Sequence, residues 1–500
     1  HMTRLRRLLR RQDGISLVMA IGTLGVLSMT GATLVFYSSS NARNAQYSNR
    51  SASAYGLAEA GINEMMAVLS KPENNALMPG LLPETTHTYD GGTVTWSGTL
   101  DPVTRRWSVV STGRLDNPTG PNAGDIERTL KAEIPVVPTL TQPLNNPAWN
   151  YIYATGTGQP CDMTVANNVD GSSRLYVEGN LCLSNNVEID QTSLLVKGNL
   201  DLSNNAEVGS PSSMSTRVET YVGGNCRYGG GSWATPCSGN QDARRIYSKK
   251  DGPNWVTGVT NSPFPVIAAP AADYDTWYAN SIPGPTQDCT SANGARTGVP
   301  PVFDNDGVRN NSVATILQLT PASSYTCRVG PAENPTGEIS WNASTKVLSV
   351  AGTVYIDGSA QVTNGSLNRY SGQATIYLSG TLLIEGKLCG GISGSNCDFA
   401  AWDPNTEMLT FAADGSGGQA GTGNGILVNN NSVFQGGLFA TANVTYSNNS
   451  RSDGPIVGEE IIFSNNVQND SFPTITTVPA GMPGNPAVYA QPNPPELYSG

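Results

Sequence analysis

Residues 175–189 read LYVEGNLCLSNNVEI, and residues 194–208 repeat them as LLVKGNLDLSNNAEV, at an offset of 19 residues. In both copies, short apolar runs are separated by Gly-Asn and Asn-Asn turns. Short strands at regular spacing predict a β-solenoid, because one coil cannot bury its inward Leu, Val and Ile side chains alone and must stack on the next coil. The sequence therefore predicts a mainly-β, solenoid-like domain around this repeat.

Weaker copies of the repeat follow. They read TYVGGNCRY at 220–228, LSVAGTVYIDGSAQV at 348–362, IYLSGTLLIEGKL at 376–388, VTYSNNS at 444–450 and IIFSNNV at 461–467. Solenoid coils are therefore expected over 161–228 and 346–472. Asn tolerates the left-handed backbone that a tight corner needs, and stacked Asn amides can hydrogen-bond along an axis. The expected corner residues are Asn185, Asn186, Asn204, Asn205, Asn448, Asn449, Asn465 and Asn466, on a ladder that starts at Asn167 and Asn168.

Two segments do not follow the repeat. Residues 229–345 are rich in Pro, Gly, Trp and Tyr and are expected to form a disulfide-tied excursion, and residues 398–424 a second loop. The Pro-rich tail, 473–500, has too little apolar content for a core of its own. We expect this tail to be extended or mobile, or to cover the terminal coil after Asn466.

A different pattern precedes the solenoid. Thr86–Leu100 predicts a hairpin around Asp90-Gly91-Gly92, and Arg106–Leu115 and Arg128–Val136 predict two more alternating strands. Together they give an antiparallel β meander within a section spanning 71–137. Pro138, Pro143 and Pro147 punctuate the residues that follow, so 138–160 is expected to be a linker.

The first forty residues carry a membrane signal. Five arginines within residues 1–14 precede Ile15–Tyr37, a run of 23 residues without a charge. Roughly 20 apolar residues in a helix span a bilayer core, and a basic flank stays in the cytoplasm. Apolar residues then recur at helical spacing up to Leu69, and Pro72 follows. One helix over 15–70 is predicted, with 15–37 crossing the membrane.

The leader and the helix resemble those of type IV prepilins. A basic leader ending in Gly14, followed by an apolar run, is similar to their class III signal, and Leu57-Ala58-Glu59-Ala60-Gly61 resembles the LAEAG-type segment of the PilX-type minor pilins. The resemblance implies an α+β pilin-like module of a long helix and a meander. It also implies cleavage after Gly14, methylation of Ile15, and helix packing in a filament through Ile15, Met19, Leu24, Leu27 and Leu34.

One departure and two alternatives accompany this resemblance. Major pilins carry a glutamate at the fifth mature position, where this chain has Met19. Its absence implies a minor, initiating or tip-located subunit rather than a shaft subunit. Ser38-Ser39-Ser40 is a weak cleavage site for an ordinary secretory signal peptide, and a single-pass anchor that never enters a filament is the other alternative.

Cysteine usage indicates an oxidising compartment, because all eight cysteines follow the apolar run and an even number outside the cytoplasm implies disulfides. Pairing of sequence neighbours is one of many possibilities. No C-x-x-C occurs and the only histidines are His1 and His87, so no metal site is expected. The candidate pairs are Cys161 with Cys182, Cys226 with Cys237, Cys289 with Cys327, and Cys389 with Cys397.

Charge disfavours nucleic acid as a partner. The net charge is −11, and removing a leader with five Arg and one Asp would change it to −15. Such a surface repels phosphates. The only basic cluster, Arg244-Arg245 with Lys249-Lys250, is expected to be a solvated loop.

Enzymatic chemistry is not expected, and neither is a cofactor. The acidic candidates for a β-helix lyase or hydrolase are scattered, without stacked positions, and Glu178 and Lys197 are expected to form a surface ion pair. With His87 alone no Ser/His/Asp triad can be built, and no Gly-Lys-Ser/Thr phosphate loop occurs. The scattered acids are Asp90, Asp170, Asp190, Asp201 and Asp357.

Function is therefore expected from display rather than catalysis. The favoured hypothesis is a minor type IV pilin-like subunit, in the cytoplasmic membrane before assembly and in an extracellular pilus afterwards. Its partners would be other pilin subunits and the pilus assembly machinery. Its solenoid would bind a polysaccharide or surface receptor, with Trp255, Trp277 and Tyr278 as the contact region. The alternatives are a membrane-anchored envelope scaffold with a self-associating solenoid, and a polysaccharide-acting β-helix enzyme.

Overall fold

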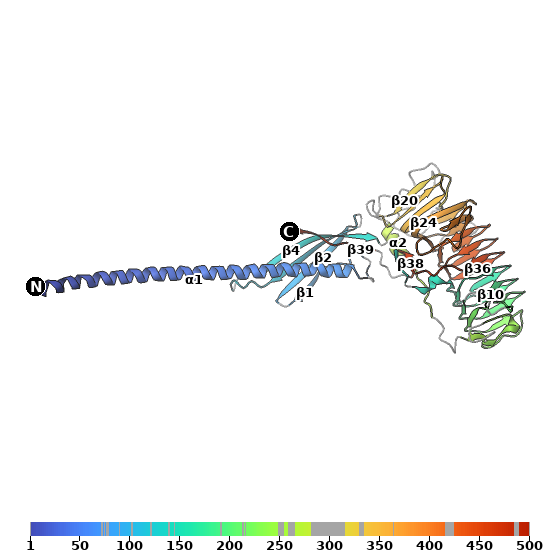
Figure 1. Ribbon diagram of the computed structural model, residues 1–500, viewed down its shortest axis with the longest axis horizontal. Coiled ribbons are helices and arrows are strands. Elements are labelled where there is room, and N and C mark those ends of the chain that lie inside the picture. The colour runs from blue at the N-terminus through green and yellow to red at the C-terminus, as the bar shows by residue number, and fades with distance from the viewer. Residues whose placement is uncertain are drawn as a thin grey trace.

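The computed structural model contains one long N-terminal helix followed by a mostly-β region with many parallel strands (Figure 1). Residues 2–14 are described by their backbone alone. The structure describes residues 2–499 except 72–73, 75, 77–79, 90, 102–103, 121–122, 139–140, 145, 191–192, 213–214, 216, 249–254, 259–265, 282–315, 330–334, 364, 416–424 and 485–489.

Helix α1 spans Met2–Leu69 without interruption, since it contains no proline. It ends at the predicted place, where the Asn74 side-chain amide donates to the Val68 carbonyl at 2.7 Å. The helix also runs through residues 2–14, so the predicted leader is continuous with the apolar segment in this structure. Its part from Ile15 onward is long and apolar enough to cross a membrane, and the apolar window has no buried residue.

The C-terminal part of α1 packs on an antiparallel sheet, and together they form what we term the N-terminal module. Its first strands are β1 (Thr85–Tyr89), β2 (Gly92–Asp101), β3 (Arg106–Leu115) and β4 (Ile126–Pro138), in that spatial order. Strand β3 coincides with the predicted strand. The helix buries a stripe at helical spacing, which comprises Ala54, Ala58, Ile62, Met65 and Leu69.

Close approach of helix and sheet depends on small residues. A Cβ atom on Gly113 of β3 would lie 2.1 Å from the Ala54 carbonyl oxygen, and one on Gly61 would lie 2.1 Å from the Ser111 hydroxyl. The Ala-Gly content of the LAEAG-like segment is therefore a packing requirement of this module.

The C-terminal tail completes the same sheet. Strands β39 (Ala490–Pro492) and β40 (Glu496–Ser499) both pair antiparallel with β4, and the C-terminus lies beside β4 in Figure 1. The expectation of a mobile tail, or one that covers a terminal coil, is therefore wrong for these residues. Backbone pairing along a strand needs little apolar content, which is why composition did not reveal it.

The parallel strands are thus an insertion between β4 and β39. The predicted linker over 138–160 is also partly structured: β5 (Thr141–Pro143) pairs with β38 (Thr477–Pro479), and the short helix η1 (Pro147–Asn150) follows. Strand β6 (Ile152–Ala154) already belongs to the parallel region, so that region begins inside the predicted linker.

Strand pairing arranges the insertion in three parallel rows, which we term the parallel stack. The first row contains β18 (Trp255–Gly258), β15 (Glu219–Val222), β12 (Ser193–Val196), β9 (Leu175–Val177), β6, β35 (Ile456–Gly458), β32 (Gly437–Ala440), β29 (Met408–Ala413), β24 (Leu367–Leu378) and β22 (Val347–Ile356). The second row contains β16 (Cys226–Tyr228), β13 (Leu200–Ser203), β10 (Leu181–Ser184), β7 (Met163–Ala166), β36 (Glu460–Ser464), β33 (Asn443–Tyr446), β30 (Gly425–Val428), β25 (Leu382–Ile384), β23 (Ser359–Val362) and β19 (Ile316–Gln318). The third contains β14 (Glu207–Val208), β11 (Glu188–Ile189), β8 (Asp170–Gly171), β37 (Gln468–Asp470), β34 (Arg451–Asp453), β31 (Val433–Gln435) and β26 (Lys387–Cys389), which pairs with the start of β24.

The chain enters this stack in the middle. From β7 it runs outward to β16 and β18 at one end, resumes at β19 at the other end and runs back to β36. Strands β18 and β19 both lie within 229–345, so the expectation that this whole segment leaves the stack is wrong for these residues. Ile461 of β36 then pairs with Met163 of β7, which closes a seam between segments almost 300 residues apart. The coil of Asn466 therefore lies in the middle of the stack and is not terminal.

Antiparallel strands adjoin both ends of the stack. At one end β17 (Gly239–Asn240) pairs antiparallel with β18. At the other end β20 (Tyr325–Val329), β21 (Gly337–Asn342) and β22 form an antiparallel set.

One corner of the stack is a double ladder of asparagines. All eight predicted Asn residues, with Asn167, Asn168, Asn430 and Asn431, have φ between 49° and 65°. Their side-chain amides bond from coil to coil and also cross the seam, where Asn167 donates to Asn465 at 3.1 Å and Asn168 to Asn466 at 3.2 Å. Left-handed backbone and amide stacking together explain the Ser-Asn-Asn repeat.

The Gly-Asn corner of the repeat is set by contact between neighbouring coils. A Cβ atom on Gly198 would lie 2.4 Å from the Gly179 carbonyl oxygen, and one on Gly224 would lie 2.6 Å from that of Gly198. The following asparagines bond to the next coil, since the Asn180 side chain accepts from the Asn199 amide at 2.9 Å.

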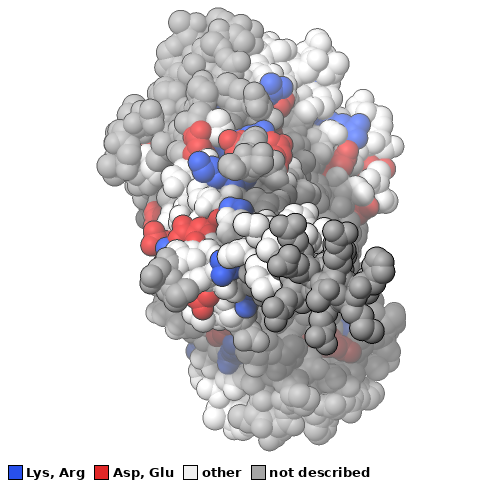
Figure 2. Space-filling view, turned by 90° about the vertical axis from the view of Figure 1, so that its left-hand side faces the viewer, with Lys and Arg blue, Asp and Glu red and all other residues white. Residues whose placement is uncertain are grey.

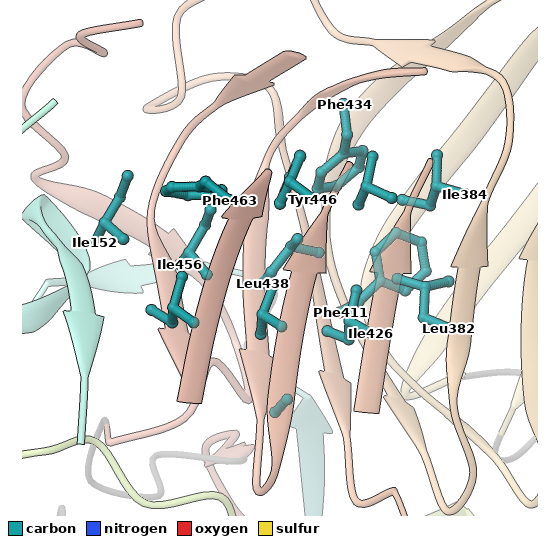
Figure 3. Close-up of a cluster of buried hydrophobic side chains, with 14 of the residues drawn as sticks. Ile152, Leu382, Ile384, Phe411, Ile426, Phe434, Leu438, Tyr446, Ile456 and Phe463 are labelled. Carbon is teal, nitrogen blue, oxygen red and sulfur yellow. The ribbon is translucent and has the colours of Figure 1, made fainter. Parts of the chain in front are cut away.

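Apolar side chains fill the interior of the stack (Figure 3). Ile152 and Ile456 meet at the seam, Phe463 and Tyr446 lie in neighbouring coils, and Phe434 and Phe411 lie together in the coil after that. The outer side of the first row carries a second, aromatic core that includes Tyr153, Tyr176, Tyr355 and Tyr377.

Part of the predicted excursion covers this aromatic core. Helix α2 (Tyr274–Ser281) lies against β22, and Trp277 and Tyr278 are 1% and 6% exposed. The expectation that these two side chains contact a ligand is therefore wrong, because they pack against Tyr377 and Tyr355. Trp255 lies on β18, and its side chain is outside the described part of the chain.

Candidate functional site

The most exposed apolar surface of the described chain is the first half of α1. Every predicted packing residue on it is largely exposed: Ile15 by 64%, Met19 by 69%, Leu24 by 68%, Leu27 by 69% and Leu34 by 67%. Surfaces of this kind mark contact with a membrane or with other protein chains. The scissile position predicted after Gly14 lies at the start of this surface, within the helix.

Polar groups on this helix are satisfied locally. The hydroxyl of Ser28 donates to the Leu24 carbonyl at 2.7 Å, and those of Thr23, Thr30 and Thr33 donate to carbonyls four residues earlier at 2.9–3.0 Å. A helix whose hydroxyls bond to its own backbone can lie in lipid or against apolar helices without leaving unpaired donors.

A buried arginine joins the N-terminal module to the stack. Arg105, in the turn before β3, is 3% exposed, and its guanidinium donates to the Thr336 hydroxyl at 3.1 Å. Burial lowers the pKa of Arg105 to about 10, so it remains charged at neutral pH. The contact brings together residues 231 positions apart and was not predicted, since no local pattern marks Arg105.

Charged groups on the stack mostly satisfy one another. The predicted pair is present: the Lys197 ammonium lies 2.5 Å from a Glu178 oxygen, and the Tyr153 hydroxyl also donates to Glu178 at 2.7 Å. Arg245 pairs with Glu207 at 2.7 Å, whereas Lys249 and Lys250 lie outside the described residues. On the face drawn in Figure 2, acidic and basic side chains lie in small mixed groups.

Acidic residues do recur at stacked positions, contrary to the sequence prediction. Asp170, Glu188 and Glu207 are in register on β8, β11 and β14. Burial raises the pKa of Glu188, and the charges of Asp190, Glu207 and Asp170 add to the effect. No group of three or more metal-ligating side chains converges among the described residues.

A polar hollow of about 470 Å³ lies beside β24 and the 390–407 segment. Arg369 and Glu407 line it and form an ion pair of 2.9 Å, and Asp403 and Thr406 lie on the same wall. The charges of Arg369 and Glu407 therefore neutralise each other within the wall of the hollow.

Disulfides tie the loops of the stack. Cys161 bonds to Cys182, Cys226 to Cys237 and Cys389 to Cys397, as neighbour pairing suggested. Cys327 is also disulfide-bonded, and Cys289, its predicted partner, lies outside the described residues.

Comparison with known proteins gives little further information. No protein-family model matches the sequence, and no curated protein matches it. Among solved structures, the chain is similar to the competence-associated pilin ComZ from Thermus thermophilus, with 12% identity over 90% of this chain and 97% of that chain. The TM-score is 0.30, which is too low to establish a shared fold.

Proposed function

We propose that this protein is a minor type IV pilin-like subunit that displays a β-solenoid outside the cell for adhesion or another surface interaction. The observation that carries the proposal is the continuous α1 helix. Its first half is an exposed apolar surface, and its second half is buried against a sheet that holds the parallel stack by insertion. One end of the molecule thus suits a membrane or a bundle of helices, and the other suits display.

A tip-located or assembly-priming position is part of this proposal. The stack lies at the end of the N-terminal module that is farther from the N-terminus (Figure 1). In a filament whose helices point toward the cell, the stack would occupy the space above the subunit's own module. That bulk, together with Met19 in place of glutamate, favours a subunit that has no neighbour ahead of it.

The self-associating scaffold is the weaker alternative. Parallel stacks polymerise through open edges, whereas antiparallel strands adjoin both ends of this one. The role that we propose is display rather than catalysis. The scaffold hypothesis is tested directly by measuring surface display after deletion of the filament assembly ATPase. We expect this deletion to abolish display, as for a pilin-like subunit.

Processing at Gly14 tests the proposal. We expect protein recovered from its native cell surface to begin at methylated Ile15, as read by intact mass and N-terminal sequencing. Gly14→Leu should retain the leader, whereas Gly22→Ala, at a position with no neighbour within 4 Å, should be processed normally. An unprocessed wild-type leader would favour a simple anchor, and a start near Asn41 would favour a secreted protein; either result contradicts the proposal.

A further inference from the structure

The stack carries one exposed aromatic side chain among its described residues, and it lies at the end formed by β16. Trp233 is 37% exposed, whereas Trp149, Trp277, Trp341 and Trp402 are at most 2% exposed. Trp233 belongs to the sequence GGGSWATPC at 229–237, a glycine-rich loop in an otherwise tightly packed domain. The fold thus buries its other described tryptophans and leaves this one in contact with solvent.

Several contacts hold the Trp233 loop in place. The loop is closed by the Cys226–Cys237 disulfide, and Ala234, next to the tryptophan, exchanges two backbone hydrogen bonds with Cys226, of 2.7 and 3.3 Å. The Arg244 guanidinium donates to the Ser232 carbonyl at 3.4 Å on the other side. A side chain on such a loop loses little conformational freedom when it binds a ligand.

A charged pair supports the indole ring. The Arg227 guanidinium lies 4.4 Å from the ring centroid of Trp233, within the range of a cation–π contact. Two hydrogen bonds from Arg227 to Asp201, of 2.9 and 2.6 Å, fix the guanidinium in turn. Arg227 therefore orients the ring, and the Asp201–Arg227 pair places polar groups close to it.

The surroundings of Trp233 indicate the chemistry of its ligand. Trp233 is the one exposed aromatic side chain among the described residues of the stack, and Gly229 and Gly230 of the same loop carry no side chain, so the loop does not form a broad apolar patch for a protein partner. Arg227 and Arg245 are both paired with carboxylates, and the chain is acidic overall, which disfavours phosphate. A flat aromatic ring beside fixed polar groups suits a ligand with one apolar face and many hydroxyls.

We propose that Trp233 is the stacking platform for a neutral sugar ring of a surface polysaccharide, with the Asp201–Arg227 pair hydrogen-bonding to its hydroxyls. The inference rests on the proposed display function and names its ligand class. It replaces Trp277 and Tyr278, which are buried, as the contact region. A tryptophan in a glycine-rich loop closed by two nearby cysteines is the sequence signal that would have found it.

Binding of neutral polysaccharides tests this assignment. The full chain, in a detergent without a sugar headgroup, is incubated with insoluble cellulose, chitin, β-1,3-glucan and mannan, and affinity is measured for the soluble hexamer of any polymer retained. We expect at least one polymer to bind. Trp233→Ala should lower the affinity for the soluble hexamer of that polymer at least tenfold, whereas the affinity of Trp233→Tyr should stay within about fivefold of wild type. Tyr89→Ala, which removes an exposed aromatic ring from the N-terminal module, is the matched control and should bind normally.

Three results would overturn the assignment. They are no binding to any of the four polymers, binding that Trp233→Ala leaves unchanged while its thermal melt matches wild type, and Trp233-dependent binding of oligo-dT in place of sugars. If Trp233→Ala alters the thermal melt, the Trp233→Tyr and Asp201→Asn variants decide. The assignment is then contradicted when Asp201→Asn leaves the sugar affinity unchanged and Trp233→Tyr abolishes it. Processing at Gly14 is read in a separate experiment, so a failed sugar assay leaves the filament proposal standing, and the reverse also holds.

Discussion

Replacing Asp453 by asparagine is expected to stabilise the parallel stack at alkaline pH. Asp453 lies on β34 and is 2% exposed. One carboxyl oxygen accepts a hydrogen bond from Gln435 at 3.3 Å, and the other has no hydrogen-bond partner among the described residues. Burial raises the pKa of Asp453 to about 8, and the charge of Asp470 adds to this, while Gln435 and Arg451 oppose it.

The sign of the effect follows from this pKa. In the unfolded chain the carboxyl ionises near its ordinary value of 3.8, whereas in the folded chain it stays neutral until about pH 8. The folded state therefore loses stability as pH rises from about 4 to about 8, by up to about 6 kcal/mol, and no further above that range. An asparagine at this position carries no charge and should remove this loss.

Urea unfolding of the full chain at pH 5 and pH 9 measures the effect. Wild type should lose stability between the two pH values, and Asp453→Asn should lose several kcal/mol less. Asp116→Asn, at an exposed position in the N-terminal module, is the control and should follow wild type. If the free energy of unfolding depends on pH in the same way for wild type and Asp453→Asn, Asp453 is ionised in the folded protein and the prediction is wrong.

Gly113→Ala is expected to disrupt the N-terminal module more than any other single methyl addition to it. The new Cβ atom would lie 2.1 Å from the Ala54 carbonyl oxygen and 2.9 Å from the Ala58 amide nitrogen, and both are backbone atoms of α1. Neither can move without shifting the helix. Overpacking of a core costs roughly 1–3 kcal/mol, and a clash with backbone should lie at or above the upper value.

Hydrogen exchange of the full chain localises this damage. In Gly113→Ala, amides of β2, β3 and the second half of α1 should exchange much faster, while those of the stack should be unchanged. Gly124→Ala is the matched control, because that position has no neighbour within 4 Å. If the amides of Gly113→Ala exchange at the same rates as those of wild type, helix and sheet are less closely packed than described.

Local patterns predicted the local structure well. Strand β3, the end of α1 near Leu69, the left-handed asparagines and the neighbouring disulfide pairs each depend on residues close in sequence. The Leu, Val and Ile alternation also identified most strands of the stack, because each inward residue repeats at the same place in the next coil. It missed β6, β18, β19 and β29, which lie in segments expected to be a linker, an excursion or a loop. Trp277 and Tyr278 were misplaced because exposure of an aromatic residue depends on what covers it.

The pairings between distant segments could not be predicted in this way. The seam of β36 with β7 joins two copies of one repeat, and either copy could have continued the ladder with another neighbour. The return of β39 and β40 to β4 rests on backbone hydrogen bonds, which leave no side-chain signature. The contact of Arg105 with Thr336 joins residues 231 positions apart, so no local pattern indicates it.

The insertion of the stack between β4 and β39 has a mechanical consequence. The outgoing and returning segments leave the sheet side by side, and β5 and β38 pair beyond it, so a pull on the stack is shared by two strands rather than one. Strand β4 is joined to β3 along ten paired residues, and tension along its axis would load this whole ladder in shear. A single proteolytic cut in the returning segment would leave the stack covalently tethered through β4, and a cut in the outgoing segment would leave it tethered through β39 and β40.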